Sequence, residues 1–139
     1  MMLQRRAVSA ALLALAITPL GGANAQTGSD KAHKVVFQVS DAEPAKWNLA
    51  LNNARNVLQD LGKDKVAIEI VAYGPGIGML KMDSVVGPRI AEAMGSGVSV
   101  VACENTMKNQ KLVRDDMLPK IGYVDAGVVQ LMKRQQQGY

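Results

Sequence analysis

Short runs of β-branched and apolar residues alternate with segments of helical periodicity over most of this chain. The clearest run covers residues 66–73 and is apolar on both sides of the strand apart from Glu69. Such a strand is typical of a parallel sheet that helices cover on both faces. Because parallel strands must be joined by long crossover connections, this alternation predicts an α/β domain.

The sequence predicts four strands and four helices. The strands cover residues 35–39, 66–73, 98–102 and 123–124, and the helices cover 44–61, 85–94, 104–113 and 127–137. We expect the second helix proper to begin near Pro88, and the last helix to turn Val128, Leu131 and Met132 toward the core. The order predicts one layered sandwich, with a mostly parallel sheet of about four to five strands flanked by helices and right-handed crossovers.

The N-terminus has the composition of an export signal. Arg5 and Arg6 precede an apolar run over residues 7–20, and Ala23-Asn24-Ala25 then provides a small-residue cleavage site. The run is too short to span a bilayer. We therefore predict a cleaved signal peptide over 1–25, a flexible lead-in over 26–33, and a domain over 34–139. The protein would be periplasmic or secreted, without a membrane anchor after cleavage, and both the general and the twin-arginine export routes stay open.

Charge and histidine content limit the classes of partner. The chain has 16 Lys and Arg against 12 Asp and Glu, and two of the arginines lie in the predicted signal peptide. No basic run interleaved with aromatic residues is present, so we expect no nucleic-acid partner. His33 is the only histidine, it falls in the predicted lead-in, and no His/Cys cluster exists. We therefore expect no metal site, and nothing in the sequence implies a cofactor.

Cys103 is the only cysteine, so it cannot form a disulfide within its own chain. It falls where a predicted strand ends and a helix begins, the place where ligands bind in open α/β sheets. A helix terminus stabilises a thiolate by only about 0.3–1 kcal/mol, and Glu104 opposes that effect. We therefore expect an accessible thiol rather than a strongly activated one. A buried, inert cysteine is an equally open alternative at this stage.

The segment 74–78 contains three glycines and follows the second predicted strand. It lacks the ending of a phosphate loop and is not the dinucleotide-binding motif. We expect a loop or turn that needs positive φ. In the functional version of this hypothesis, Gly74, Gly76 and Gly78 form one wall of a ligand pocket near Cys103.

Four segments together resemble the DsrE/DsrF-like family, most closely its small exported members. The segments are Lys34-Val35-Val36-Phe37-Gln38-Val39-Ser40, Trp47-Asn48 with Asn52-Asn53-Ala54, Tyr73-Gly74-Pro75-Gly76, and Val100-Val101-Ala102-Cys103-Glu104-Asn105-Thr106-Met107. The resemblance extends over residues 34–139. It implies a DsrE/F-like α/β sandwich and homo-oligomers. For cytoplasmic relatives it also implies sulfur-carrier work, in which a cysteine accepts sulfane sulfur as a persulfide, and only Cys103 matches that role.

These observations lead to two classes of function. In the first, the protein handles sulfur in the periplasm: Cys103 accepts a sulfane sulfur and passes it to a thiol or sulfur-carrier protein. Backbone N–H groups after Cys103, with Asn105 and Thr106, would support the anion beside Glu104. In the second, the chain is a non-enzymatic module that binds a small ligand or assembles into oligomers, and Cys103 is inert. The sequence leaves open whether the protein is an enzyme, such as a sulfurtransferase, or a carrier.

Overall fold

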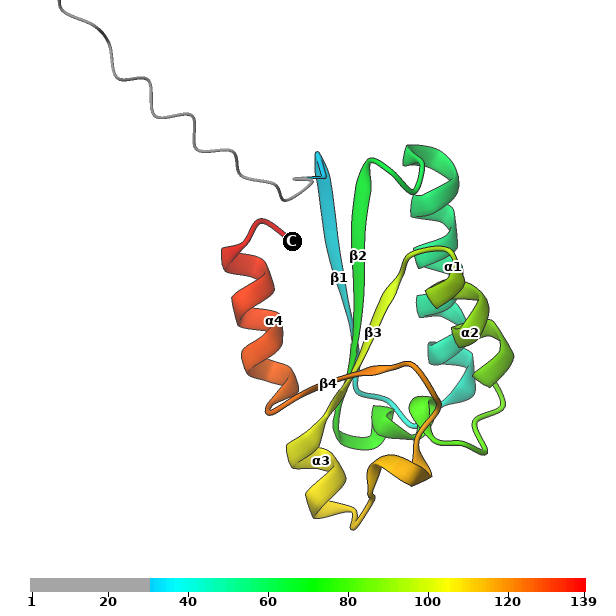
Figure 1. The fold of residues 1–139 in the computed structure, drawn as a ribbon, viewed down its shortest axis with the longest axis vertical. Helices are drawn as coiled ribbons and strands as arrows, with labels where there is room; N and C mark the ends of the chain where they lie inside the picture. The colour runs from blue at the N-terminus through cyan, green and yellow to red at the C-terminus, as the bar shows by residue number, and fades with distance from the viewer. Residues whose placement is uncertain (1–30) are drawn as a thin grey trace, which may run out of the picture.

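A single four-stranded sheet organises the described part of the molecule (Figure 1). The computed structural model describes residues 31–139, so the predicted signal peptide and most of the predicted lead-in lie outside it. The strands are β1 (His33–Val39), β2 (Val66–Ala72), β3 (Ser99–Cys103) and β4 (Gly122–Val124). They lie in the order β1-β2-β3-β4, and every neighbouring pair is parallel. The predicted α/β class and parallel sheet are confirmed.

Four α-helices and two 3-10 helices connect and cover the strands. The α-helices are α1 (Pro44–Leu61), α2 (Gly87–Gly95), α3 (Glu104–Asn109) and α4 (Gly127–Gln136), and the 3-10 helices are η1 (Gly74–Leu80) and η2 (Arg114–Asp116). Helix α2 begins one residue before Pro88, in agreement with the prediction. No helix in residues 31–139 combines the length and the apolar character that crossing a membrane requires.

Among the differences from the predicted boundaries, three concern the site or the edge of the sheet. Segment 74–78 is the first part of a 3-10 helix rather than a loop. Helix α3 ends at Asn109 instead of residue 113, because Lys111 has a φ of 55° and the chain turns away there. His33 belongs to β1, where its N–H donates to Lys65 O at 3.0 Å, so it lies in the sheet and not in a lead-in.

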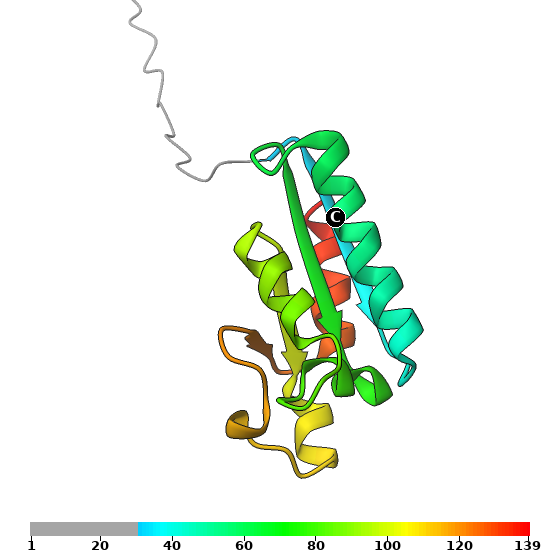
Figure 2. The same ribbon diagram turned by 90° about the vertical axis from the view of Figure 1, so that its right-hand side faces the viewer.

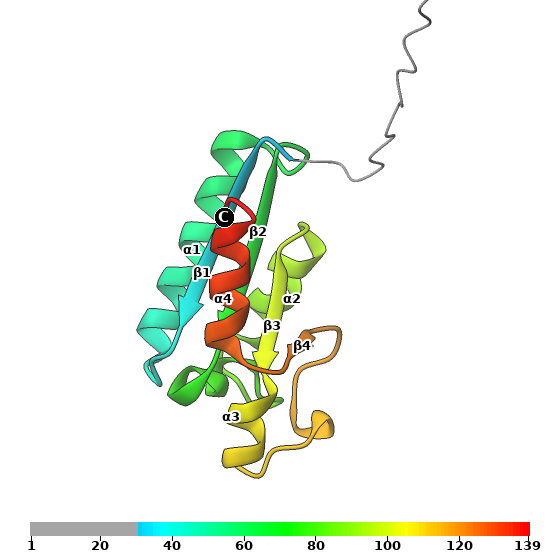
Figure 3. The same cartoon turned by 90° about the vertical axis from the view of Figure 1, so that its left-hand side faces the viewer.

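The helices form layers on opposite faces of the sheet. Helices α1 and α2 cover one face, and α4 crosses the other, as the two side views show (Figures 2 and 3). Helix α3 lies beyond the carboxyl end of β3, at the lower end of the molecule in Figure 1. The last helix therefore returns over β1 and β2 after the chain has reached β4.

The face that α1 and α2 cover contains the main apolar core. Alternate side chains of β2, including Ile68 and Ile70, pack there with Leu51 of α1 and Ile90 of α2, and all four are buried. Burying one such side chain stabilises the fold by roughly 1.5–3 kcal/mol. Gly76 joins η1 to this core, because a Cβ at that position would collide with the carbonyl of Val39.

The face that α4 covers is polar at its centre. Glu69 points to this side of β2 and is 1% exposed. The predicted inward direction of Val128 and Met132 is wrong: their exposed fractions are 63% and 50%, and only Leu131 of that set is half-buried. Helix α4 instead presents its polar side to the sheet, because a buried carboxylate needs hydrogen-bond donors.

Candidate functional site

Cys103 is both the last residue of β3 and the N-cap of α3. Its Sγ accepts a hydrogen bond from the Thr106 N–H at 3.5 Å and lies 4.0 Å from the Asp125 carbonyl oxygen. The residue is only 5% exposed. The predicted position at the junction of strand and helix is thus correct, but the expected accessibility is wrong, because the chain entering α4 passes against the sulfur.

Several donors converge on the Cys103 sulfur. Burial raises the thiol pKa, but hydrogen bonds from the Thr106 side chain and N–H, and from the N–H groups of Gly127 and Asn105, outweigh that effect and lower the pKa. The first turn of α4 therefore adds a donor to those of α3. The thiol is therefore covered rather than accessible, and its pKa is lowered from the ordinary value of a cysteine.

Thr106 connects the sulfur to the glycine segment. The Gly74 N–H donates to Thr106 Oγ1 at 2.8 Å, and the Gln110 side chain donates to the Gly74 carbonyl oxygen at 3.3 Å. Gly74 has a φ of +54°, a conformation that favours glycine. The Thr106 hydroxyl that accepts from Gly74 also contributes to the lowered pKa of Cys103. Gly74 thus contributes to the site through Thr106.

The other two predicted glycines lie apart from the sulfur and have packing roles. The Gly76 N–H donates to the Tyr73 carbonyl oxygen at 3.1 Å, so it is already engaged within η1. Gly78 lies against the Trp47 ring, which a Cβ at Gly78 would approach to 3.3 Å. Neither glycine supplies a donor to Cys103.

Glu104 follows Cys103, but its charge is compensated. Arg114 Nη2 lies 2.8 Å from Glu104 Oε1, and the Arg114 guanidinium also stacks 4.2 Å from the centre of the Tyr123 ring. The predicted opposition between Glu104 and a Cys103 thiolate is therefore weakened by a cation ten residues further along the chain. Asn105 is exposed, and its backbone N–H donates to the Asp125 carbonyl oxygen at 3.1 Å.

Sequence reasoning missed the contribution of the segment that joins β4 to α4. The sequence predicts Gly127 only as the start of the last helix, yet a Cβ there would lie 2.9 Å from the Tyr73 Cβ, and its N–H contributes to the lowered pKa of Cys103. A glycine at a helix start is a weak signal, because Gly is only modestly favoured there. The close approach of Gly127 to Tyr73 depends on the tertiary fold.

A groove of about 350 Å³ lies between β4 and α4, beside the segment that covers Cys103. Its lining includes Val124, the β4 residue paired with Cys103, and Lys133 of α4. A larger groove of about 710 Å³ lies at the amino end of β3, next to Val98 and Ile121. The larger groove therefore lies at the opposite end of β3 from the sulfur, whereas the smaller one lies next to the segment that covers the sulfur.

Metal-ligand clusters are absent from the described region. Residues 31–139 contain no group of three or more His, Cys, Asp or Glu side chains that could hold a metal ion. His33 begins β1 at the amino edge of the sheet, whereas Cys103 ends β3 at the carboxyl edge. His33 and Cys103, which are both residue types that bind metals, therefore lie at opposite edges of the sheet.

The chain was compared with known families, curated proteins and solved structures. No family model matches it, and no curated protein matches it. A solved structure of the MTH1491 protein from Methanobacterium thermoautotrophicum, described as a protein of unknown function, shares 34% identity with a TM-score of 0.73. The match covers 77% of this chain and 95% of that protein. This chain therefore belongs to the same family as the MTH1491 protein.

Proposed function

We propose that the protein handles sulfur in the periplasm, with Cys103 accepting a sulfane sulfur as a persulfide and passing it to a partner thiol. The observation that carries this proposal is the position of Cys103 as the N-cap of α3, where its Sγ accepts from the Thr106 N–H at 3.5 Å, and the donors around it lower the pKa of the thiol. A thiolate is the nucleophilic form of cysteine, so these donors favour the reactive species. The resemblance to the DsrE/DsrF-like family supports the same role.

The proposed chemistry is a pair of sulfur displacements. The Cys103 thiolate attacks the outer sulfur of a donor persulfide, a new S–S bond forms, and the donor's own thiolate leaves. An acceptor thiolate then attacks the outer sulfur on Cys103, and the Cys103 thiolate is regenerated as the leaving group. Each step exchanges one S–S bond for another without an external oxidant. The same donors stabilise the thiolate before the reaction and the anion that leaves.

Partner proteins follow from this chemistry. The acceptor would be a thiol or sulfur-carrier protein, because the sulfur must pass to a second thiolate. Helix α4 exposes Val128, Val129 and Met132, and this apolar surface supports assembly into homo-oligomers. The periplasmic location depends on the export signal predicted over residues 1–25.

The proposal is tested by intact-mass measurement after incubation with inorganic polysulfide. The wild-type protein should gain the mass of one sulfur atom or more, and dithiothreitol should remove it. The Cys103→Ser variant should gain none, whereas Thr106→Val should gain the adduct more slowly, because it retains the sulfur but loses one donor. Equal adduct levels in wild type and Cys103→Ser would refute the role of Cys103.

The second candidate is a non-enzymatic ligand-binding or oligomeric module with an inert Cys103. The low exposure of this residue and the groove beside α4 favour it. Alkylation of the native protein with iodoacetamide separates the two functions. An absence of labelling over hours, with full labelling in denaturant, would support the inert cysteine.

A further inference from the structure

Helix α4 is attached to the sheet mainly through polar groups. Gly127 is its only buried residue, and its larger apolar side chains, including Val128 and Met132, face outward. Elsewhere along the helix, Lys34 Nζ of β1 donates to the Gln137 carbonyl oxygen at 3.1 Å, just after the last turn. A helix with so little buried apolar surface depends on its polar contacts to stay in place.

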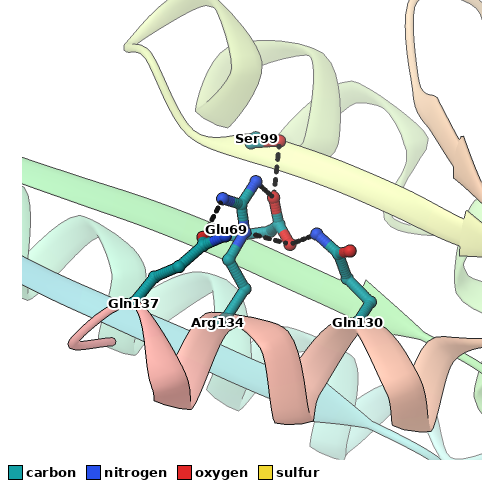
Figure 4. A network of polar contacts seen from close by, with 5 residues as sticks. All are labelled: Glu69, Ser99, Gln130, Arg134 and Gln137. Atoms are coloured by element: carbon teal, nitrogen blue, oxygen red, sulfur yellow. Dashed lines mark hydrogen bonds and ion pairs between the residues drawn. The ribbon is translucent and has the colours of Figure 1, made fainter. Parts of the chain in front are cut away.

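The principal contact is a group of four residues that we call the Glu69 cluster: Glu69, Ser99, Gln130 and Arg134 (Figure 4). Arg134 Nη2 and Nε donate to the two Glu69 oxygens at 2.7 and 3.1 Å. Gln130 donates to Glu69 Oε1 at 2.6 Å, and the Ser99 hydroxyl donates to Oε2 at 3.4 Å. A paired arrangement of this kind is strong and directional, so it fixes the position of the helix on the sheet.

The same helix covers Cys103 with its other end. The chain that enters α4 lies against the sulfur: the Asp125 carbonyl oxygen is 4.0 Å from Cys103 Sγ and accepts from the Asn105 backbone N–H at 3.1 Å, and the Gly127 N–H contributes to the lowered pKa of the thiol. Glu69 itself lies on β2 opposite Ser99, four residues before Cys103 on β3. Glu69 therefore does not contact the sulfur directly. Any effect of Glu69 on Cys103 is transmitted through α4.

We infer that Glu69 is a positioning residue for Cys103: by holding Gln130 and Arg134 it keeps the first turn of α4 over the sulfur. Detachment of α4 from the sheet is then the motion that opens Cys103 to a partner. A covered thiol needs such a step, because a second thiol cannot reach it in the closed form. The inference rests on the proposed function for the identity of the reacting atom.

The test compares the rate of Cys103 alkylation by iodoacetamide in wild type and Glu69→Gln across pH. Glutamine keeps the shape of Glu69 but removes the charge that holds Arg134. At a pH above the thiol pKa, we expect labelling to be about tenfold faster in Glu69→Gln. The midpoint of its pH profile should also move upward, because the Gly127 N–H leaves the sulfur. The acidic residues on adjoining segments are Glu104, which is paired, and Asp125, which is exposed.

A matched control separates positioning from general loss of stability. Ile90→Val weakens the apolar core on the opposite face and should leave both the labelling rate and the pH midpoint unchanged. Labelling of Glu69→Gln should also depend weakly on urea, as local opening does. If Glu69→Gln is poorly folded, Arg134→Gln should show the same two changes, because it removes the partner of Glu69.

The outcomes are decisive. An unchanged rate and midpoint in both Glu69→Gln and Arg134→Gln would overturn the inference, as would a change that Ile90→Val reproduces. The proposed function can fail separately: a protein that shows these alkylation effects but gains no sulfur from polysulfide has the positioning residue without the sulfur chemistry. A sulfur adduct that forms equally fast in wild type and Glu69→Gln supports the function and refutes the positioning role.

Discussion

The two faces of the sheet are built by different physical means. On the side of α1 and α2, apolar residues such as Leu51, Ile70 and Ile90 pack together and are buried. On the side of α4, a carboxylate is buried and the covering helix turns polar residues toward it. Hydrophobic packing is insensitive to direction, whereas charge-assisted hydrogen bonds are directional.

This difference separates stability from control of the site. The apolar face contributes most of the free energy of folding, because the favourable term scales with buried apolar area. The polar face contributes less but sets the position of α4, and α4 supplies a donor to Cys103. Variants on the two faces should therefore change different measured quantities.

The largest effect on stability is expected on the apolar face. Ile70 has no exposed surface, and Ile70→Ala should lower the free energy of unfolding by about 3 kcal/mol through lost burial and a cavity. Urea denaturation measures this loss, and Ile70→Val should cost about 1 kcal/mol. The pH midpoint of Cys103 alkylation should stay constant in both. A shifted midpoint in Ile70→Val would show that the two faces are not independent.

The next effect concerns the polar face and depends on pH. Burial raises the Glu69 pKa, but hydrogen bonds from Arg134, Gln130 and Ser99, with the Arg134 charge, outweigh it, so the pKa lies below its ordinary value of 4.5. The ionised form is thus favoured in the folded state. Its contribution to stability is complete above pH 4.5 and declines as pH falls through the lower folded pKa.

Glu69→Gln should consequently be less stable than wild type by about 2 kcal/mol at neutral pH, a figure that allows for the 29% exposure of the Arg134 side chain. The difference should shrink as the solution is acidified below pH 4.5. Denaturation of both proteins from neutral to acidic pH checks this. A difference that stays constant with pH would mean that the carboxylate charge is not what holds α4.

Two helical glycines offer a matched pair with a smaller effect. Gly127→Ala places a Cβ against Tyr73 and should destabilise the protein by about 1 kcal/mol while raising the Cys103 pKa. Gly95→Ala meets nothing within 4 Å and should be neutral or slightly stabilising, since alanine is the better helix former. Thermal melts and alkylation profiles measure both quantities. Equal behaviour of the two variants would contradict the close contact of Gly127 with Tyr73.

The smallest effect is expected on the outward surface of α4. Val128→Ser should change the free energy of unfolding by no more than about 0.5 kcal/mol, because the side chain is mostly exposed. Light scattering on the same variant measures its mass in solution. A larger loss of stability, together with a fall in mass, would show that another copy of the chain covers this surface.

Local patterns predicted much of the fold. The apolar run of β2 and the helical spacing of α1 are sufficient to predict these two elements, because the pattern of apolar residues in each segment shows which side is buried. The direction of α4 was predicted wrongly, because Val128 and Met132 have the spacing of a core face. Glu69 binds the polar side of α4 and so turns that side toward the sheet, but Glu69 is 65 residues from Arg134 in the chain. Such a pairing leaves no periodic signal in either segment.

The sequence likewise predicts only those parts of the site that are close to one another in the chain. Cys103 and Thr106 are neighbours in sequence, so strand-end reasoning located them. The covering of the sulfur depends on Asp125 and Gly127, and the neutralisation of Glu104 depends on Arg114, all of which arrive from later segments. The sequence therefore located the thiol but not its exposure or acidity.

The strand order has a consequence for the sequence of events in folding. Each strand pairs with the one before it, so the sheet can grow in the order in which the chain is synthesised. Among the described residues, helix α4 follows all the strands and packs back onto β1 and β2, so it closes a loop of 103 residues between Lys34 and Gln137. Cys103 is consequently uncovered in the nascent chain until the segment around Asp125, which follows β4, reaches the sulfur.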